Sequence, residues 1–193
     1  MNGDNNNFGE LKPSSLCGYV YYDLNNDGIF QAGEAPIPGS TVTLTGTDDL
    51  GVVGPIVMLT DVNGHYCFTD LRPGTYTINE NQPVGYSDGK DTHGTPGGGV
   101  PSNDQFANIP LGPGVNGDNN NFGELKPSSL CGYVYYDLNN DGIFQAGEAP
   151  IPGTTVTLTG TDDLGAVGPV VMLTDVNGHY CFTSLRPGTY TIN

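Results

Sequence analysis

A long internal repeat constrains this chain more than any other feature of its sequence. Residues 2–79 align without a gap with residues 116–193, at an offset of 114 residues, and only four of the 78 aligned positions differ. The four differences are Ser40/Thr154, Val52/Ala166, Ile56/Val170 and Asp70/Ser184. Because repetition this close is the mark of a modular array, the chain is expected to contain copies of one structural unit.

Composition and residue patterns indicate that this unit is built from β-strands. The 193 residues include 30 Gly, 15 Pro and no Trp, which is typical of short strands joined by tight turns. Residues 15–23 are rich in aromatic and β-branched residues, and residues 40–47 alternate apolar with polar side chains, so both ranges predict strands. Between residues 80 and 115, only residues 105–111 have a strand pattern, and long loops are expected elsewhere.

A second pair of strands is predicted in residues 54–71, on either side of Asn63 and Gly64. An Asn-Gly pair suits a type I′ turn, because both central positions of that turn need a positive φ. The sequence therefore predicts a hairpin at this point, followed by a further strand in residues 72–79.

The repeat and the strand pattern together divide the all-β chain into modules. Residues 14–125 make one complete module, with a closing strand predicted at 119–125. Residues 2–11 match the end of that module and are interpreted as the closing strand of a preceding one. Residues 130–193 are interpreted as an incomplete second module. The connecting residues 126–129 contain a proline, and such a short linker would hold neighbouring modules in a nearly fixed relation.

The segment DLNNDGIFQAGE occurs at residues 23–34 and again at residues 137–148. It matches the calcium-loop pattern D-x-N-x-D-G-x5-E, in which side-chain oxygens and one backbone carbonyl surround a hard cation. The predicted ligands are Asp23, Asn25, Asp27, Ile29 (carbonyl) and Glu34, and in the second copy Asp137, Asn139, Asp141, Ile143 (carbonyl) and Glu148. The alternative is an Asx-rich turn without an ion, which leaves a carboxylate at position 12 of the loop unexplained.

The charge of the chain favours the same chemistry. There are 21 Asp and Glu against 5 Lys and Arg, for a formal net charge of −16. So few positive charges cannot neutralise phosphates, so nucleic acid and anionic membrane surfaces are not expected as partners. Membrane insertion is not expected either, because no stretch approaches the roughly 20 apolar residues of a membrane span. Ca²⁺ is the expected cofactor, since each ion removes two of the charges that oppose a compact state.

Three stretches, taken in order, resemble one known family. They are GYVYYDLNNDGIFQAGEAPIPGSTVTLTG, then TDVNGHYCFTDLRPGTYTI, then NNFGEL. This succession resembles the SdrD B-like repeats, calcium-binding relatives of the Cna B-type, prealbumin-like modules of bacterial surface stalks. The resemblance implies tandem antiparallel β-sandwich modules, Ig-like or prealbumin-like, at an extracellular cell surface, with calcium in the loop after the first strand. A pair of cysteines in each module departs from the family pattern.

Other acidic residues in predicted turns and loops are weaker candidates for metal ligands. Their spacing is irregular, and ordinary solvated loops explain them equally well. These residues are Asp88, Asp91, Asp104, Asp118, Asp48, Asp49 and Asp61.

The cysteines occur as Cys17 and Cys67, and 114 residues later as Cys131 and Cys181. In an acidic and apparently exported chain, a disulfide within each module is expected. Buried free thiols and bridges between neighbouring chains are the alternatives. The absence of a C-x-x-C motif, with the histidines placed elsewhere, argues against zinc.

The function predicted from these features is structural: an extracellular repeat protein that forms a calcium-stiffened stalk or filament. Its partners would be copies of itself, joined in a tandem array or head to tail through an added strand. An adhesin or carbohydrate-binding module, with Tyr19, Tyr21, Tyr22 and the long loops of residues 80–104 as a contact surface, is the alternative. An enzyme is not expected, because no nucleophile is paired with a base in the sequence patterns.

Overall fold

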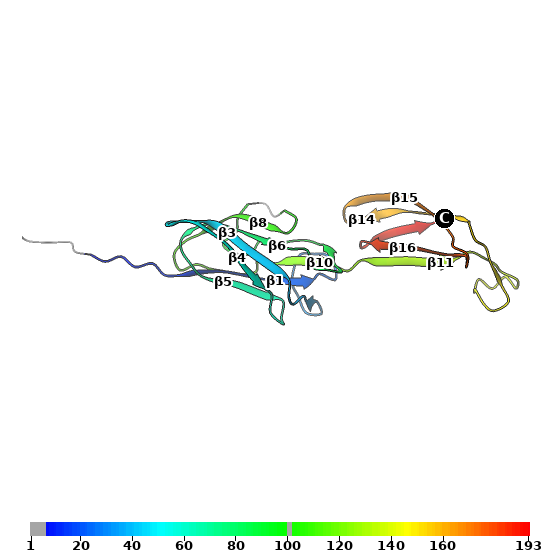
Figure 1. The fold of residues 1–193 in the computed structure, drawn as a ribbon, viewed down its shortest axis with the longest axis horizontal. Coiled ribbons are helices and arrows are strands. Elements are labelled where there is room, and N and C mark those ends of the chain that lie inside the picture. Colours follow the sequence, from blue (N-terminus) through cyan, green and yellow to red (C-terminus); the bar gives the residue numbers. More distant parts are fainter. Residues whose placement is uncertain (1–6, 100–101) are drawn as a thin grey trace, which may run out of the picture. The chain divides into compact units, whose positions relative to one another are not determined.

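The computed structural model describes residues 7–99 and 102–193 of the chain (Figure 1). The described residues form strands and no helix, as the composition predicts. The chain divides into two compact units, Met1–Leu125 and Lys126–Asn193. Each unit is described by itself below.

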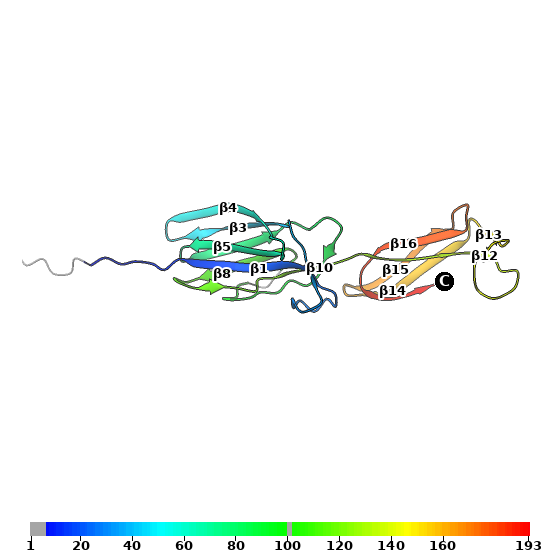
Figure 2. The same ribbon diagram turned by 90° about the horizontal axis from the view of Figure 1, so that it is seen from below.

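The first unit is a sandwich of two sheets, which can be followed in Figures 1 and 2. Its strands are β1 (Ser14–Tyr22), β2 (Ala35–Pro36), β3 (Thr41–Asp48), β4 (Gly51–Leu59), β5 (His65–Leu71), β6 (Gly74–Glu80), β7 (Ser87–Asp88), β8 (Gln105–Leu111), β9 (Asn116–Gly117) and β10 (Phe122–Leu125). One sheet has the order β2-β1-β10-β7, with β5 and β9 also paired to β1. The other sheet has the order β4-β3-β6-β8.

The core of the first unit lies between these two sheets. Leu16 and Val20 of β1 alternate with outward-facing residues, and Val42 and Leu44 of β3 do the same, so each strand turns one face inward. Fully buried rings of β8 and β10 fill the middle, where Phe106 stacks on Phe122 with ring centroids 4.4 Å apart. The period-two pattern of the sequence therefore marks the core-facing side correctly.

The closing strand predicted at residues 119–125 is confirmed as β10. It runs parallel to β1, with Val20 opposite Phe122 and Tyr22 opposite Glu124. The short strand β9 also pairs with β1 in parallel. The end of the module thus lies beside its first strand, and Phe122 packs into the core. This pairing brings together residues that are about one hundred positions apart in the chain.

The hairpin predicted around Asn63 and Gly64 is wrong. Strand β4 pairs with β3, and β5 pairs with β1, so residues 60–64 cross from one sheet to the other. Gly64 has a positive φ of 70°, but the turn is held by the Asp61 carboxylate, which accepts the backbone N–H groups of Asn63 and His65. A local turn signal could not show that the two flanking strands find partners elsewhere.

The second unit repeats part of this architecture. Its strands are β11 (Ser128–Tyr133), β12 (Tyr135–Tyr136), β13 (Ala149–Pro150), β14 (Thr155–Asp162), β15 (Gly165–Leu173), β16 (His179–Leu185) and β17 (Gly188–Ile192). Strand β11 pairs with β16, β12 with β13, and β14 lies between β15 and β17. Because β11 begins at Ser128, the ordered strand already includes half of the predicted linker, as expected for the counterpart of β1.

The buried cluster of the second unit is smaller, with Val156, Leu158 and Phe182 at its centre. Leu130 is 37% exposed, whereas its counterpart Leu16 is fully buried. The predicted closing strand at residues 2–11 is only partly described. Residues 2–6 lie outside the described part, and residues 7–11 are exposed and form no strand.

Candidate metal centre

The twelve-residue loop of the first unit starts directly after β1 and is closed by its own acidic side chains. Asp23 is fully buried, and its carboxylate accepts the N–H groups of Asp27 at 3.2 Å and Gly28 at 2.7 Å. The carboxylate of Glu34 reaches back across the loop to accept the N–H groups of Leu24 at 3.1 Å and Gln31 at 3.0 Å. The first and last residues of the pattern therefore fix the loop from both ends.

The middle of the loop is held by Asp27. One oxygen of this carboxylate accepts a hydrogen bond from the N–H of Ile29 at 2.9 Å. The other oxygen accepts hydrogen bonds from the side-chain amides of Asn25 and Gln31. These donors lower the pKa of Asp27, with the bond from the Ile29 N–H as the main cause. Gly28 supplies the sharp turn with a φ of +82°, a conformation that costs glycine little.

The second copy of the loop forms the same bonds without the help of a closing strand. Asp137 accepts the N–H of Gly142 at 2.9 Å, Asp141 accepts that of Ile143 at 2.9 Å, and Glu148 accepts that of Leu138 at 3.1 Å. The Asn139 side chain donates to Asp141, and bonds from its neighbours lower the pKa of the Asp141 carboxyl. The loop conformation is therefore encoded locally by the twelve residues.

The loop carries its oxygen-bearing residues in the sequence order that is typical of a calcium loop. Carboxylate oxygens that accept one N–H keep lone pairs for a cation. The three loop carboxylates are not among the described groups whose ligand atoms all lie within 4.8 Å of one another. The fit to a hard cation thus rests on the donor types and on the loop conformation, and the carboxylates would have to draw closer around an ion.

A second acidic centre lies inside the first unit and is tighter than the loop. Ligand atoms of Glu80, Asp104 and Glu124 all lie within 4.8 Å of one another, and so do those of Asp88, Asp91 and Asp104. We call these five residues the acidic cluster. Asp104 is shared by both triplets and precedes β8, Glu80 ends β6, and Glu124 lies on β10. A cavity of about 230 Å³ lined by Asp88, Asp91 and their neighbours adjoins it.

The carboxylates of the acidic cluster are poorly compensated. Glu80 is 4% exposed and Glu124 is fully buried. Within residues 7–99 and 102–193, neither oxygen of Glu80 has a hydrogen-bond partner, and one oxygen each of Asp91, Asp104 and Glu124 is also buried and unpartnered. Glu124 accepts a bond from the Gln82 amide, and Asp91 accepts the N–H of Asp104 at 3.0 Å.

Burial and mutual repulsion raise the pKa values in this cluster. The pKa of Glu80 rises to about 10, first through burial and then through the charge of Glu124. Burial, followed by the charge of Asp88, raises the pKa of Asp91 to about 8. The pKa of Glu124 also rises to about 8, chiefly through burial. Burial raises the pKa of Asp104 as well.

The acidic cluster fits a divalent cation. Buried polar atoms without partners are uncommon in folded proteins, and each needs a physical explanation. The five carboxylates of the acidic cluster offer only hard oxygen donors, which are the ligands that Ca²⁺ takes six to eight at a time. Two of them, Asp88 and Asp91, also line the adjoining cavity, together with Lys90. Ionised carboxylates this close together and this deeply buried need a compensating charge.

The structure brings three of the weaker predicted ligands, Asp88, Asp91 and Asp104, into the acidic cluster. The other four do not join either site. Asp48 accepts two N–H groups of the turn between β3 and β4, and Asp49 forms an ion pair with Arg72 at 2.6 Å. Asp61 closes the turn before β5, and Asp118 accepts the N–H of its neighbour Asn119 at 2.8 Å.

The sequence analysis did not identify Glu80 and Glu124 as candidate ligands. The alternation of inward-facing and outward-facing residues along a strand nevertheless indicates that both are buried. Glu80 continues the inward-facing series of Tyr76 and Ile78 on β6, and Glu124 is two residues beyond the buried Phe122. A charged residue in the inward phase of a strand points into the protein and requires a partner. Acidic residues on strands, and not only those in loops, are therefore candidates for metal ligands in this fold.

Both expected disulfides are present, Cys17–Cys67 and Cys131–Cys181. Each one links directly opposite positions of neighbouring strands, β1 with β5 and β11 with β16. The argument against zinc assumed that the histidines lie away from the cysteines, and this assumption is wrong. Ligand atoms of Cys17, His65 and Cys67 lie within 4.8 Å of one another.

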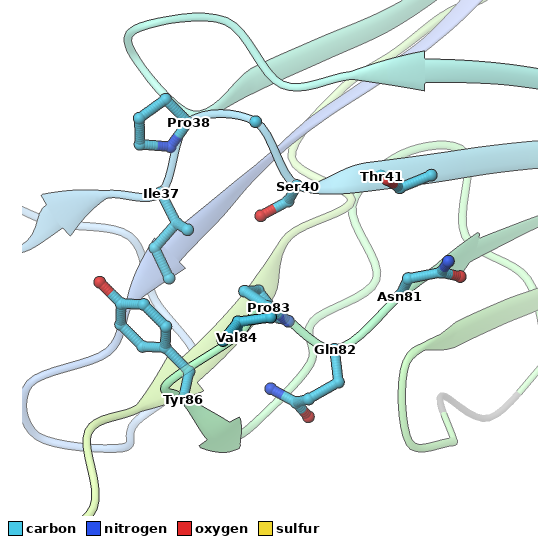
Figure 3. Close-up of a pocket in the computed structure, with 10 residues that line it drawn as sticks. Ile37, Pro38, Ser40, Thr41, Asn81, Gln82, Pro83, Val84 and Tyr86 are labelled. Atoms are coloured by element: carbon cyan, nitrogen blue, oxygen red, sulfur yellow. The ribbon is translucent and has the colours of Figure 1, made fainter.

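A groove at one end of the first unit's sandwich is a different feature. It has a volume of about 470 Å³ and is lined only by uncharged residues, including Ile37, Ser40, Gln82 and Tyr86. Figure 3 shows Ile37 and Tyr86 on opposite sides of this groove. It contains no carboxylate, so the acidic cluster is the stronger candidate for a metal centre.

The aromatic contact surface considered for an adhesin is not formed. Tyr21 is fully buried, and Phe30 packs on both Tyr19 and Tyr21 with ring centroids 5.1 and 4.8 Å away. Tyr22 packs against the core and lies near Tyr86. The three tyrosines therefore serve the fold and do not form an exposed strip.

The all-β sandwich, its acidic loop and its buried carboxylates define a class of repeat module with candidate cation sites. The chain belongs to the SdrD B-like domain family, which matches residues 14–107 and 128–193. This membership agrees with a location outside the cell, at the cell surface. No helix among the described residues is long and apolar enough to cross a membrane.

Similar curated proteins include two from staphylococci. The chain is 37% identical over 179 residues to the serine-aspartate repeat-containing protein F of Staphylococcus epidermidis, covering 90% of this chain and 10% of that protein. It is 35% identical over 193 residues to the serine-aspartate repeat-containing protein D of Staphylococcus aureus strain Newman, covering 95% of this chain and 14% of that protein. The chain thus spans only a small part of these relatives.

Solved structures with a similar arrangement include two pilins. The minor pilin GBS52 of Streptococcus agalactiae matches with a TM-score of 0.41 at 13% identity, over 94% of this chain and 82% of that one. A streptococcal ancillary pilin matches with a TM-score of 0.40 at 14% identity, over 92% of this chain and 52% of that one.

Proposed function

We propose that this chain is a structural, non-catalytic part of a surface stalk or filament whose modules are stiffened by Ca²⁺. The observation that carries the proposal is the acidic cluster, where Glu80 and Glu124 are buried with unpartnered carboxylate oxygens. A divalent cation would attract both carboxylates, which otherwise repel each other, and would thereby connect β6 of one sheet to β10 of the other. Such a bridge opposes the sliding or parting of the two sheets.

The loops at residues 23–34 and 137–148 would contribute in a different way. The first loop directly follows β1 and the second directly follows β12, and each has the ligand order of a calcium loop. An ion held by Asp23, Asp27 and Glu34 would reduce the repulsion between these carboxylates and fix the loop against β1. Extracellular calcium modules bind at about 10⁻⁴–10⁻³ M, so such sites fill outside a cell.

The tandem role is supported by the near-identity of the two copies. A spacer needs each unit to have the same surfaces as the next, and only four of 78 aligned positions differ. We propose other copies of the module as the partners, in a covalent array or through strand addition. In the second route, residues 2–11 of one chain would take the place beside β11 that β10 takes beside β1.

Amide hydrogen exchange, read by mass spectrometry with Ca²⁺ and with a chelator, tests the stiffening. The proposal predicts slower exchange with Ca²⁺ in residues 23–34, 80–91 and 137–148, and in the strands that flank them. Residues 49–50, in the turn that the Asp48 carboxylate already closes, serve as the internal control and should exchange alike in both solutions. Identical exchange throughout the chain would contradict the proposal.

A further inference from the structure

The outer face of the β1–β5 pair carries a group of side chains that calcium binding does not use. Cys17 and Tyr19 of β1 alternate with the buried Leu16 and Val20, so they point away from the core. Cys67 likewise follows the buried Tyr66 on β5. The half-exposed side chains on this face are therefore accessible from solvent.

The register of the two strands sets these side chains side by side. Cys17 is directly opposite Cys67, and Tyr19 is directly opposite His65. Since His65 and Cys67 are two positions apart on one strand, they share a face. Two sulfur atoms and one imidazole nitrogen consequently lie within 4.8 Å of one another. The second unit repeats the arrangement with Cys131, His179 and Cys181.

Aromatic contacts hold the imidazole in this position. The ring of His65 lies 5.0 Å from that of Tyr19, which is itself 5.1 Å from the ring of Phe30. No hydrogen bond to a ring nitrogen of His65 is formed within the described part of the chain, so the nitrogen lone pair is available. In the second unit, Tyr133 lies at 4.9 Å from His179 and at 5.0 Å from Phe144.

We propose that each of these Cys-His-Cys groups is a redox-gated binding site for a thiophilic divalent cation of the zinc class. In the oxidised chain the disulfide occupies both sulfur atoms. Two small thiols supply two electrons and two protons, which breaks the Sγ–Sγ bond, produces two cysteine thiols and leaves the small thiols joined as a disulfide. The cation then binds both sulfurs and the imidazole nitrogen, and the two thiol protons pass to solvent.

The dimensions suit such an ion. Zinc–sulfur bonds of about 2.3 Å and zinc–nitrogen bonds of about 2.0–2.1 Å place tetrahedral ligand atoms less than about 4 Å apart. Directly opposite Cβ atoms on antiparallel strands are about 4.5–5.5 Å apart, which allows two thiolates to converge on one ion. Water completes the fourth position from the solvent side. The strands need not separate, because the pairs Leu16–Phe68 and Gly18–Tyr66 flank the disulfide.

Cobalt titration of the full chain tests this proposal. The chain is reduced with a phosphine under argon, freed of reductant, saturated with Ca²⁺ to occupy carboxylate sites, and titrated with Co²⁺. Two Co²⁺ ions per chain are expected, with thiolate-to-cobalt charge transfer and the intense visible bands of a tetrahedral site. Zn²⁺ should abolish these bands by displacement, and the oxidised chain should show none of them.

Histidine variants show whether the imidazole is a ligand of the bound ion. His65→Asn together with His179→Asn should weaken Co²⁺ binding at least tenfold and change the visible bands, whereas His93→Asn, outside the group, should leave both unchanged. Circular dichroism of the reduced chain in Ca²⁺ should retain the strand signal. Absence of thiolate-to-cobalt bands, unchanged binding in the double variant, or loss of the strand signal on reduction would each overturn the proposal.

Discussion

Glu80 and Glu124 place carboxylate oxygens within 4.8 Å of each other and of an Asp104 oxygen, although they belong to different sheets of the first unit. Charges at this separation repel strongly where water is scarce. The arrangement is therefore compatible with bound protons or with a bound cation, but not with three bare carboxylates. The predictions for the acidic cluster follow from this choice.

Substitution of Glu80 by Gln should lower stability in calcium but not in a chelator. In a chelator, E80Q removes a buried ionisable group and should leave the free energy of unfolding unchanged or higher. In Ca²⁺ at about a hundredfold excess over Kd, loss of a site costs about 2.7 kcal/mol. Urea unfolding in both solutions measures this difference. E10Q, at an exposed position, is the control, and a change of the same sign in both solutions would rule out a cation at Glu80.

The stability of the calcium-free chain should fall as pH rises from about 5 to 8. The pKa of Glu80 is raised to about 10, and those of Asp91 and Glu124 to about 8. In this window the folded chain binds more protons than the unfolded chain, so each increase in pH favours unfolding. Asp27 and Asp61 have lowered pKa values, so their carboxyl groups titrate below this pH window.

Thermal unfolding in a chelator at a series of pH values measures this dependence. With saturating Ca²⁺ the slope should become flat or reverse, because the ion competes with protons for the same oxygens. A calcium-free chain whose stability rises steadily over this range would contradict the assignment.

Replacement of Asp27 by Ala should remove one calcium loop without unfolding the module. The Asp27 carboxylate organises the centre of the loop through Ile29 and Gln31. The calcium-induced rise in Tm should therefore shrink in D27A and shrink again in the double variant with D141A. D61A is the matched control, because Asp61 accepts two turn N–H groups in the same way. It should lower Tm equally with and without Ca²⁺.

The substitutions Phe122→Ala and Phe8→Ala compare the closing strand of the first unit with its repeated copy at residues 2–11. Phe122 is fully buried and stacks on Phe106, whereas its counterpart Phe8 is 94% exposed. A buried Phe→Ala substitution costs about 3–5 kcal/mol, so F122A should strongly destabilise the first unit. F8A should have little effect on the stability of the isolated chain. Equal effects of the two substitutions would show that Phe122 is not a core residue in solution.

The sequence alone could predict the local parts of this structure. The repeat, the twelve-residue loop and the alternating strands depend on residues close together in the chain, and each was predictable. The pairing of β4 with β3 depends on competition between distant segments, and the Asn63-Gly64 turn gave no information on it. The same holds for the acidic cluster, because Glu80 and Glu124 meet only after β10 returns beside β1.

Calorimetric titration of the full chain with Ca²⁺ at neutral pH tests the central claim most directly. The account predicts saturable binding of more than two ions per chain. The variant E34Q/E148Q should lose binding at the two loops, and E80Q/E124Q should lose binding at the acidic cluster while keeping that of the loops. A titration without saturable heat, or a stoichiometry that neither variant changes, would contradict it.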